Sequence, residues 1–588
     1  MAIKRAPKKN QRNTKKLSPA GTRWRFVTAL GVLFFVFSIL VARAAYIQVI
    51  NPEQYSLQGD LRSLRSDSLG VQRGMIVDRN GRELAVSVPV ETVWADPKRI
   101  AESGALADQR RWQALAETFR MNRDELLAKV DDPDRRFVYL QRKVSPSEAD
   151  YVRQLGIPGV YLKTESRRYY PTGEISAHVV GITNIDGQGQ EGLELLYDDH
   201  LTGTPGKRVY RKDAQGRVIE EISQTDAQPP KQLTLSIDQR IQATAYTELK
   251  KAVRYNQATS GSAVVVNVKT GELLAMVNSP SYNPNNRADL QSFKMRNRTI
   301  TDAYEPGSTV KPLVVLSALE HGTHKVGDII DTNPGWLRIG GRRVSDHRNL
   351  GKLSLTEVLE HSSNVGVTTM ALELGVDKLL ETYFDAGFGS DTGVSLLGES
   401  YGLLTTRRRW SDFELATLSY GYGLSATTLQ LAKAYTMIAN GGRDMPLTVF
   451  RRESKPESEQ VFNPDNTRAV LHMMERVVSD GTATAAQVPG YRIAGKTGTS
   501  RKARATGGYG DEYVALFAGI APASNPEIVV VVTINEPGTD DYYGGTAAAP
   551  VFSSIVSQTM RLLNVPPDDM TSQPMKAAGF VGGADATP

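Results

Sequence analysis

Ser308-Thr309-Val310-Lys311 is the stretch of this 588-residue sequence that decides its fold class, because two further short motifs follow it in order. Ser362-Ser363-Asn364 begins 54 positions after Ser308, and Lys496-Thr497-Gly498 begins 134 positions after Ser362. Each motif alone is weak evidence, since patterns this short arise by chance in a long chain. The ordered set S-x-x-K, S-x-N, K-T-G is typical of enzymes that form an acyl intermediate on a serine. The sequence therefore predicts an active-serine acyl-transfer site.

The first motif supplies a candidate nucleophile and a candidate base. Positions i and i+3 of a helix share a face, so we expect Ser308 and Lys311 to point into the same cleft. Pro306-Gly307 fits a chain that turns sharply into a helix start, where unpaired backbone N–H groups and the macrodipole favour negative charge. Lys311 can act as a base only if its pKa is depressed, and burial beside a second cation, Lys496, would do that. The alternative interpretation, an ordinary Ser–Lys pair on a helix, does not explain the other two motifs.

The second motif precedes Val365-Gly366-Val367, where a helix or a loop edge is expected. We expect the Ser362 hydroxyl to relay a proton and the Asn364 amide to hold substrate. The alternative is a polar turn or a helix cap, and the tripeptide alone does not exclude it.

The third motif lies in Gly495-Lys496-Thr497-Gly498-Thr499, which the sequence predicts to be an edge strand facing the cleft. Glycines on each side would let a substrate backbone lie close and pair as an added strand. Lys496 with the Thr497 and Thr499 hydroxyls suits a terminal carboxylate. The backbone N–H of Thr499 is a candidate partner for that of Ser308 in an oxyanion hole. The alternative is a strand that ends in a turn.

The charge distribution and the lack of cysteine exclude several classes of function. Residues 1–25 hold nine Lys or Arg and no acidic residue, so the rest of the chain carries a net charge of −3 although the total is +6. A nucleic-acid-binding protein carries its basic surface on the folded part, so this class is excluded. With no cysteine, the chain has no thiolate nucleophile, disulfide or cysteine-based metal site. We expect neither a metal nor another cofactor.

The N-terminal segment predicts a membrane anchor at residues 26–46. Residues 26–42 contain no charge and would span about 26 Å as a helix. Trp24 and Tyr46 flank the apolar run, and the preceding positive charges predict that the tail at residues 1–25 is cytoplasmic. A cleaved signal peptide is the alternative, because Ala42-Arg43-Ala44 resembles a cleavage site, but the apolar run is longer than such peptides usually have.

The remaining chain divides by pattern into three parts. Residues 60–228 are expected to form a separate module of strands and turns, with a hairpin at 74–81 and helical periodicity at 110–130. Residues 233–563 are expected to form an α/β unit with an antiparallel sheet, in which a hairpin at 261–276 and strands at 513–520 and 528–534 lie beside helices. We expect hydroxyl caps at Ser308, Ser354 and Thr427. Residues 564–588 are predicted to be a disordered tail.

Three other patterns imitate functional sites. Gly398-Glu399-Ser400-Tyr401-Gly402 matches G-x-S-x-G, but a nucleophile elbow needs a following helix and a later Asp and His, and only His472 follows. His321 and His324 are three residues apart without supporting carboxylates, so we interpret them as surface residues rather than metal ligands. His361 adjoins Ser362, but we expect it to face solvent or the core.

The chain closely resembles the class B penicillin-binding proteins of bacterial cell division, of the proteobacterial type. The likeness covers nearly the whole sequence, including the basic tail, the anchor and the N-terminal module. The stretches that carry it are residues 73–81 (RGMIVDRNG), 165–171 (ESRRYYP), 296–299 (RNRT), 305–312 (EPGSTVKP), 421–424 (GYGL) and 542–545 (YYGG). The resemblance implies a single N-terminal transmembrane helix, an α+β pedestal module that mediates interactions, and a transpeptidase domain like that of serine β-lactamases.

The resemblance also implies an activity and a set of partners. The family members are D,D-transpeptidases of the inner membrane that face the periplasm, cross-link peptidoglycan stem peptides at the division septum and are trapped by β-lactam antibiotics. It implies the septal glycosyltransferase FtsW and other divisome proteins as partners. It assigns Ser308 as nucleophile and Lys311 as leading base candidate, with Ser362 and Lys496 assisting proton movement. The substrate-binding residues that it implies are Asn364, Thr497, Gly498, Thr499 and Tyr542.

Two other functions stay open at this point. A D,D-carboxypeptidase or β-lactamase would pass the acyl group to water instead of an amine. A penicillin-binding sensor or scaffold would carry a vestigial catalytic unit, against which the intact Ser308, Lys311 and Lys496 argue.

Overall fold

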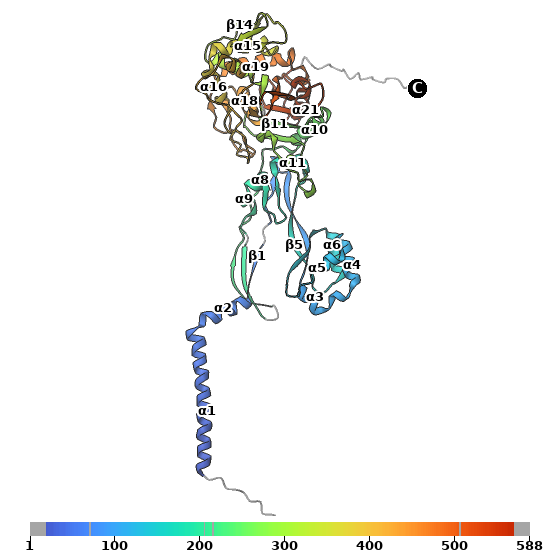
Figure 1. Cartoon of the computed structure of the whole chain (residues 1–588), viewed down its shortest axis with the longest axis vertical. Helices are drawn as coiled ribbons and strands as arrows, with labels where there is room; N and C mark the ends of the chain where they lie inside the picture. The colour runs from blue at the N-terminus through green and yellow to red at the C-terminus, as the bar shows by residue number, and fades with distance from the viewer. Residues whose placement is uncertain (1–18, 70–71, 205, 214–216, 505–506, 570–588) are drawn as a thin grey trace, which may run out of the picture. The chain divides into compact units, whose positions relative to one another are not determined.

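The computed structural model describes residues 19–69, 72–204, 206–213, 217–504 and 507–569. The chain forms two compact units, one of Met1–Val71 with Thr204–Pro229 and one of Gln72–Gly203 with Pro230–Pro588 (Figure 1). Most of the basic tail and of the C-terminal tail considered above lies outside the described residues.

The first unit contains the apolar N-terminal helix. Helix α1 (Pro19–Ala45) continues into a π-helical turn (Tyr46–Ile50) and is followed by α2 (Pro52–Ser63). The segment Arg23–Ile50 has a mean hydropathy of 2.3 in its most apolar window and is 0% buried, so it is long and apolar enough to cross a membrane. The predicted span at 26–46 lies within this helix. An antiparallel sheet with the order β1-β8-β9 completes the unit (β1, Leu64–Leu69; β8, Gly206–Lys212; β9, Val218–Thr225).

The N-terminal module of the second unit is built on a sheet of five strands. Strands β10, β2, β3 and β4 follow one another across the sheet, and β5 also pairs with β3. The predicted hairpin at 74–81 is confirmed: Val77 pairs with Glu83, and Gly81 turns the chain at a φ of 81° that suits glycine. The strands are β2 (Ile76–Val77), β3 (Glu83–Ala95), β4 (Val138–Val144), β5 (Val160–Tyr169) and β10 (Leu233–Thr234).

Four helices cover one face of strands β3, β4 and β5: α3 (Pro97–Ser103), α4 (Gln109–Thr118), α5 (Arg123–Ala128) and α6 (Pro146–Leu155). Their core includes Val93, Trp112 and Leu126, each 0% exposed. The helical periodicity predicted at 110–130 therefore belongs to two helices. The break falls at Arg120, whose φ is 51°, and Asn122 then caps α5 by accepting a hydrogen bond from Asp124 N.

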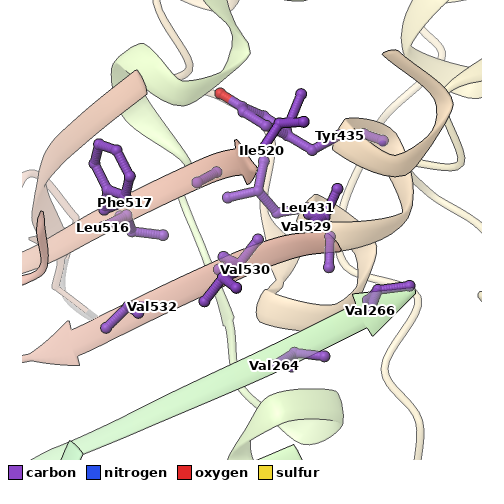
Figure 2. Close-up of a cluster of buried hydrophobic side chains, with 14 of the residues drawn as sticks. Val264, Val266, Leu431, Tyr435, Leu516, Phe517, Ile520, Val529, Val530 and Val532 are labelled. Carbon is purple, nitrogen blue, oxygen red and sulfur yellow. The ribbon is translucent and has the colours of Figure 1, made fainter. Parts of the chain in front are cut away.

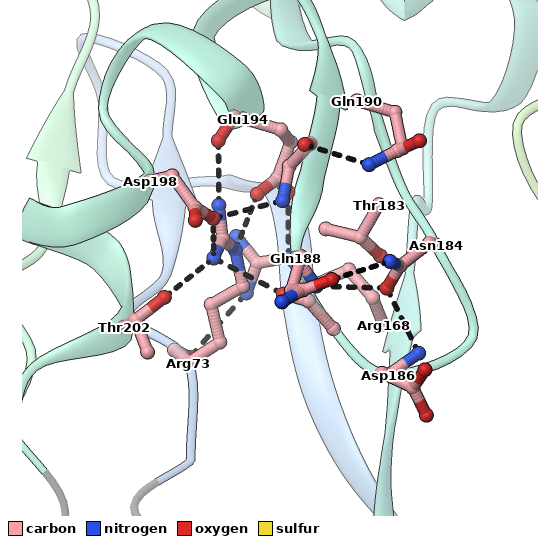
Figure 3. A network of polar contacts seen from close by, with 12 residues as sticks. Arg73, Arg168, Thr183, Asn184, Asp186, Gln188, Gln190, Glu194, Asp198 and Thr202 are labelled. Atoms are coloured by element: carbon pink, nitrogen blue, oxygen red, sulfur yellow. Dashed lines mark hydrogen bonds and ion pairs between the residues drawn. The ribbon is translucent and has the colours of Figure 1, made fainter.

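A buried ionic network ties the N-terminal module together (Figure 3). Glu194 is 0% exposed and accepts from Arg73 Nε at 2.5 Å and from Arg168 Nε at 2.7 Å. Arg73 also contacts Asp198 at 2.6 Å and Thr202 at 2.9 Å. Because buried charges need partners, this network fixes the strand ends and the short helices α8 (Gly192–Leu196) and α9 (Asp198–Thr202) against one another.

The larger part of the second unit contains an antiparallel sheet with the order β12-β11-β23-β22-β21. The hairpin predicted at 261–276 is confirmed as β11 and β12, and the strands predicted at 513–520 and 528–534 lie in β22 and β23. The bounds are β11 (Ser260–Asn267), β12 (Leu273–Ser279), β21 (Ala494–Ala503), β22 (Tyr509–Ala521) and β23 (Ile528–Asn535). Strand β21, which carries the K-T-G motif, is an edge strand as expected.

Helices pack on both faces of this sheet, so β23 is buried along its whole length and β11 along nearly all of it. Phe517 of β22 pairs with Val532 of β23, and its ring packs against Phe552 of α21 (Ala549–Leu562), with ring centroids 4.7 Å apart. Thr533 follows Val532 on β23, and its Oγ1 forms a hydrogen bond of 3.0 Å with Oγ1 of Thr428 in α18 (Thr428–Ala439). Since adjacent strand residues point to opposite faces, α21 and α18 lie on opposite sides. Figure 2 shows Leu431 and Tyr435 of α18 among the valines of the sheet.

The remaining elements surround this core. The helices are α7 (Ala177–Val180), α10 (Gln239–Tyr255), α11 (Ser292–Met295), α12 (Arg298–Thr301), α13 (Lys311–Glu320), α14 (Leu355–Glu360), α15 (Asn364–Leu374), α16 (Val376–Asp385), α17 (Asp412–Ser419), α19 (Pro464–Ser479) and α20 (Gly544–Ala547). Small two-stranded pairs are β6 (Ile182–Thr183) with β7 (Gly189–Glu191), β13 (Ala303–Tyr304) with β18 (Ala426–Thr427), β14 (Ile329–Asp331) with β17 (Lys352–Ser354), β15 (Trp336–Ile339) with β16 (Arg342–Ser345), and β19 (Arg443–Asp444) with β20 (Glu459–Gln460).

Two of the three predicted hydroxyl caps are confirmed. Ser354 and Thr427 each form a capping box with the residue three positions later. The prediction for Ser308 is wrong, because Ser308 lies inside a 3₁₀ turn (Gly307–Val310) that runs into α13, and neither of these two helix starts has a side-chain cap. The Ser308 hydroxyl is therefore not used as a cap.

Candidate active site

The Ser308 segment is held between β21 and α18. Gly307 has a φ of 54°, and a Cβ atom there would lie 3.1 Å from the backbone oxygen of Thr499, so glycine favours this close approach. Ser500 Oγ donates to the backbone oxygen of Glu305 at 2.7 Å. On the other side, Tyr435 OH donates to the backbone oxygen of Thr309 at 2.8 Å. These contacts fix the backbone on both sides of Ser308 and place it beside the K-T-G strand.

Lys311 connects the first motif to the second. Its side chain is 0% exposed, and Nζ lies 2.6 Å from the backbone oxygen of Ser362, 3.2 Å from Ser362 Oγ and 2.7 Å from Asn364 Oδ1. All three acceptors come from the S-x-N motif, 51 to 53 residues away along the chain. Tertiary folding thus brings Lys311, Ser362 and Asn364 within hydrogen-bonding distance.

The S-x-N segment has a strained start that a neighbouring carboxylate stabilises. Ser362 has a φ of 56°, which is uncommon for a residue other than glycine. Asp346 accepts hydrogen bonds from Ser363 Oγ at 2.6 Å, from Asn364 N at 2.5 Å and from Val365 N at 3.1 Å. Ser363 also caps α15 by accepting from Gly366 N. The role of Asp346 was not predicted, because a single Asp in a loop 16 residues before the motif carries no recognisable signal.

Lys496 points into the interior from the edge strand. It is 0% exposed, and its Nζ has no hydrogen-bond partner among the described residues. Burial lowers the pKa of Lys496 to about 7. Burial also lowers the pKa of Lys311 well below its usual range, and the charge of Lys496 lowers it further, whereas Asp346 raises it. The two amines are therefore coupled, and at least one can lose its proton near neutral pH.

The glycines in and beside the third motif let the strand lie close to neighbouring parts of the protein. A Cβ atom at Gly498 would lie 2.7 Å from the backbone oxygen of Pro306, and one at Gly495 would lie 2.6 Å from the Phe517 ring. Both glycines therefore allow the strand to approach the protein's own core and the Ser308 segment. Among the strands that the structure describes, β21 pairs only with β22, which leaves its other edge unpaired in the sheet.

The hydroxyl groups of the third motif are tied to neighbouring segments. Thr497 Oγ1 lies 3.3 Å from Thr482 Oγ1, and Thr499 Oγ1 accepts a hydrogen bond from Gly544 N at 3.0 Å. This second contact joins the strand to the Tyr542-Tyr543-Gly544-Gly545 segment. Tyr542 stacks on Tyr513 of β22, with ring centroids 4.1 Å apart.

The other serine and histidine patterns stay apart from this arrangement. No helix directly follows Ser400; its Oγ accepts a hydrogen bond from Gly402 N in a turn. His361 is the C-cap of α14. His321 lies 3.4 Å from Glu381, and His324 lies 3.4 Å from Glu373. Because His324 is only 7% exposed, the prediction that both histidines are surface residues is wrong for His324.

Comparison with known proteins agrees with this geometry. The family model for the penicillin binding protein transpeptidase domain matches residues 261–557, and that for the penicillin-binding protein dimerisation domain matches residues 68–235. The peptidoglycan D,D-transpeptidase FtsI of Escherichia coli K12 is 48% identical over 551 residues, which cover 93% of each chain.

Solved structures show the same fold. A peptidoglycan synthetase from Bifidobacterium adolescentis has a TM-score of 0.69 at 27% identity, over 87% of this chain and 98% of that chain. Penicillin binding protein 3 of Mycobacterium tuberculosis, solved with aztreonam, has a TM-score of 0.66 at 28% identity, over 86% and 98% of the two chains.

The chain belongs to the penicillin-binding protein family and combines a dimerisation domain with a serine transpeptidase domain. The expected fold and the expected enzyme class, a serine-type peptidoglycan D,D-transpeptidase, are thereby confirmed.

Proposed function

We propose that the chain cross-links peptidoglycan stem peptides at the division septum through an acyl-enzyme on Ser308. The observation that carries the proposal is the buried Lys311 amine, which lies at the junction of the Ser308 turn and the S-x-N motif. Ser308 Oγ attacks the carbonyl carbon between the two terminal D-alanines of a stem peptide. The C–N bond breaks, and the last D-alanine leaves as a free amine after it gains a proton. An amine of a neighbouring stem, that of a diaminopimelate residue, then displaces Ser308 and forms the cross-link.

Lys311 is the general base in this scheme. Its pKa is depressed by burial and by Lys496, so the amine can be neutral and accept the Ser308 proton at neutral pH. Once Lys311 has taken the Ser308 proton, its Nζ donates to Ser362 Oγ at 3.2 Å, and the Ser362 hydroxyl passes its own proton to the leaving amine. Lys496 assists this proton movement from the other side. The remaining acceptors, the Ser362 carbonyl and Asn364 Oδ1, hold the Lys311 amine in place.

The substrate lies along the free edge of β21. Its backbone pairs with Thr497, Gly498 and Thr499 as an added strand, while the Asn364 amide group and the ring of Tyr542 bound the cleft. The backbone N–H groups of Ser308 and Thr499 stabilise the oxyanion. A β-lactam follows the same first step, but no second amine displaces it, so the acyl-enzyme accumulates.

The first unit anchors the enzyme. Helix α1 crosses the inner membrane, with the basic tail in the cytoplasm and the catalytic domain in the periplasm. We assign residues 60–228 to the pedestal module and residues 233–563 to the transpeptidase domain. FtsW and other divisome proteins are the proposed partners, because a septal transpeptidase must act where new glycan strands are made.

A cross-linking assay tests the proposal. The purified full-length chain in detergent is given a pentapeptide donor and an amine acceptor, and the products are separated by mass. We expect a cross-linked product that Ser308→Ala abolishes. Hydrolysed donor without a cross-linked product would support a carboxypeptidase instead, and activity in the Ser308→Ala variant would show that another residue is the nucleophile.

A further inference from the structure

The sheet of the N-terminal module has one face that its helices do not cover. Val93 and Ala95 of β3 point into the core beneath α3 to α6, and both are 0% exposed. Trp94 lies between them and points to the opposite face. In the strand register, Trp94 pairs with Tyr139 of β4 and with Tyr161 of β5. Three aromatic side chains therefore stand side by side across three strands.

Phe137 joins these residues, and we call Trp94, Phe137, Tyr139 and Tyr161 the aromatic row. Ring centroids are 4.9 Å apart for Trp94 and Phe137, 4.8 Å for Trp94 and Tyr161, and 4.8 Å for Phe137 and Tyr139. Phe137 is 44% exposed, Tyr161 40% and Tyr139 36%. Because the rings hold one another in position, this exposed surface is formed before any ligand binds and loses little side-chain entropy on binding.

Unpaired cations continue the same face along β5. Lys163 and Arg167 follow Tyr161 at intervals of two and six residues, so both point to the side of the aromatic row. Both are exposed, and neither forms an ion pair within the described part of the chain. The acidic Glu165 between them is already bonded to Arg142, to Thr92 and to Tyr139. The face therefore offers aromatic rings at one end and free positive charge beyond them.

We propose that this face binds a peptidoglycan strand as a second contact with the polymer, separate from the Ser308 cleft. Sugar rings of a glycan chain present C–H faces that pack on aromatic rings, and stem peptides carry carboxylates that match Lys163 and Arg167. The inference rests on the proposed function for the identity of the polymer.

The shape of the patch favours a polymer over a protein. A stable protein interface buries about 800 Å² on each partner around an apolar centre. The aromatic row crosses β4, β3 and β5 and is followed by the buried Thr92 on β3 and the exposed Lys163 on β5, and a narrow strip of this kind fits an extended chain. A strand held here keeps further stem peptides near the enzyme, because a second contact raises their effective concentration at the cleft.

Co-sedimentation with insoluble peptidoglycan tests the proposal. The full-length chain in detergent is first acylated with penicillin, so that binding at the Ser308 cleft is blocked, and its sedimented fraction is then titrated. We expect Tyr139→Ala with Tyr161→Ala to weaken binding by about tenfold, since two ring contacts are lost. Lys163→Glu with Arg167→Glu should weaken it comparably and flatten its dependence on salt. Tyr255→Ala is the matched control, because Tyr255 is a 79% exposed tyrosine on α10, outside this face.

Labelling by fluorescent penicillin and the thermal midpoint establish that each variant is folded. Unchanged sedimentation of both double variants would overturn the proposal, and the face would then serve a protein partner or none. Turnover of a soluble pentapeptide donor should be unchanged in these variants. The two proposals can also fail separately. If the aromatic-row variants sediment less than the wild-type chain, but the wild-type chain does not form cross-links, the inference is supported and the proposed function is refuted.

Discussion

The Nζ atom of Lys311 lies 2.6 Å from the backbone oxygen of Ser362, a residue whose φ of 56° is unfavourable for its side chain. This contact connects the helix that follows the Ser308 turn to the start of α15. A strained backbone persists only where surrounding contacts hold it. Lys311 on one side and the Asp346 hydrogen bonds to Ser363 and Asn364 on the other supply those contacts. The lysine therefore has a structural role in addition to the catalytic one that we propose.

Replacing Lys311 separates these two roles. Lys311→Met keeps the volume and removes the amine, so we expect acylation by fluorescent penicillin to slow by about 10²- to 10⁴-fold. Two contributions to the free energy of unfolding oppose each other in this variant. The three acceptors of the Lys311 amine lose their hydrogen-bond donor, which destabilises the fold, whereas the removal of a buried amine stabilises it. Stopped-flow labelling and thermal unfolding measure the two effects. Labelling at the wild-type rate would exclude Lys311 as the base.

The acylation rate should depend on pH through the coupled lysines. Acylation requires neutral Lys311, so its rate rises with pH as the pair loses a proton. Asp346→Asn removes the negative charge that raises the pKa of Lys311, and the rise should move to lower pH. Lys496→Met removes the positive charge that lowers the same pKa, and the rise should move to higher pH. Rate profiles with a β-lactam in excess measure both shifts; shifts in the same direction would contradict this electrostatic account.

Tyr435 should influence the nucleophile through the backbone. Tyr435→Phe removes the hydrogen bond to Thr309 O beside Ser308 and should cost about 1 kcal/mol of stability. Acylation should slow as well, because the Ser308 turn loses a support. Tyr383→Phe is a matched control, since Tyr383 is equally buried and donates to Leu418 O at 3.1 Å. Chemical denaturation and labelling rates are the measurements; equal slowing in both variants would argue against a specific role for Tyr435.

The buried network of the N-terminal module should be sensitive to the loss of its anion. Glu194→Gln leaves Arg73 and Arg168 without their shared buried carboxylate, and we expect a loss of about 3–5 kcal/mol. Glu221→Gln, in the exposed pair with Arg208, should change stability by less than about 1 kcal/mol. Denaturation curves followed by intrinsic fluorescence compare the variants. A similar small effect in both would show that the network does not stabilise the module.

Much of the architecture could be predicted from local patterns. The hairpins at 74–81 and 261–276, the strands of the main sheet and the caps at Ser354 and Thr427 depend on residues close together in sequence. Alternation, turn residues and capping boxes are short-range signals, so they are visible without a structure. The stretch at 110–130 shows the limit of prediction from local patterns. Its apolar residues look like one continuous helix, but the helix breaks at Arg120 and the chain forms two.

The sequence by itself determined the three motifs, their order and the apolar N-terminal helix, since each is a property of neighbouring residues. Only the tertiary structure decided which atoms meet: Lys311 with Ser362 and Asn364, Asp346 beneath the S-x-N segment, and Gly498 against Pro306. These contacts join segments separated by up to nearly two hundred residues, and no local pattern encodes them. The same reason explains why the glycines of the third motif serve the protein's own packing, which depends on the segment that folds against them.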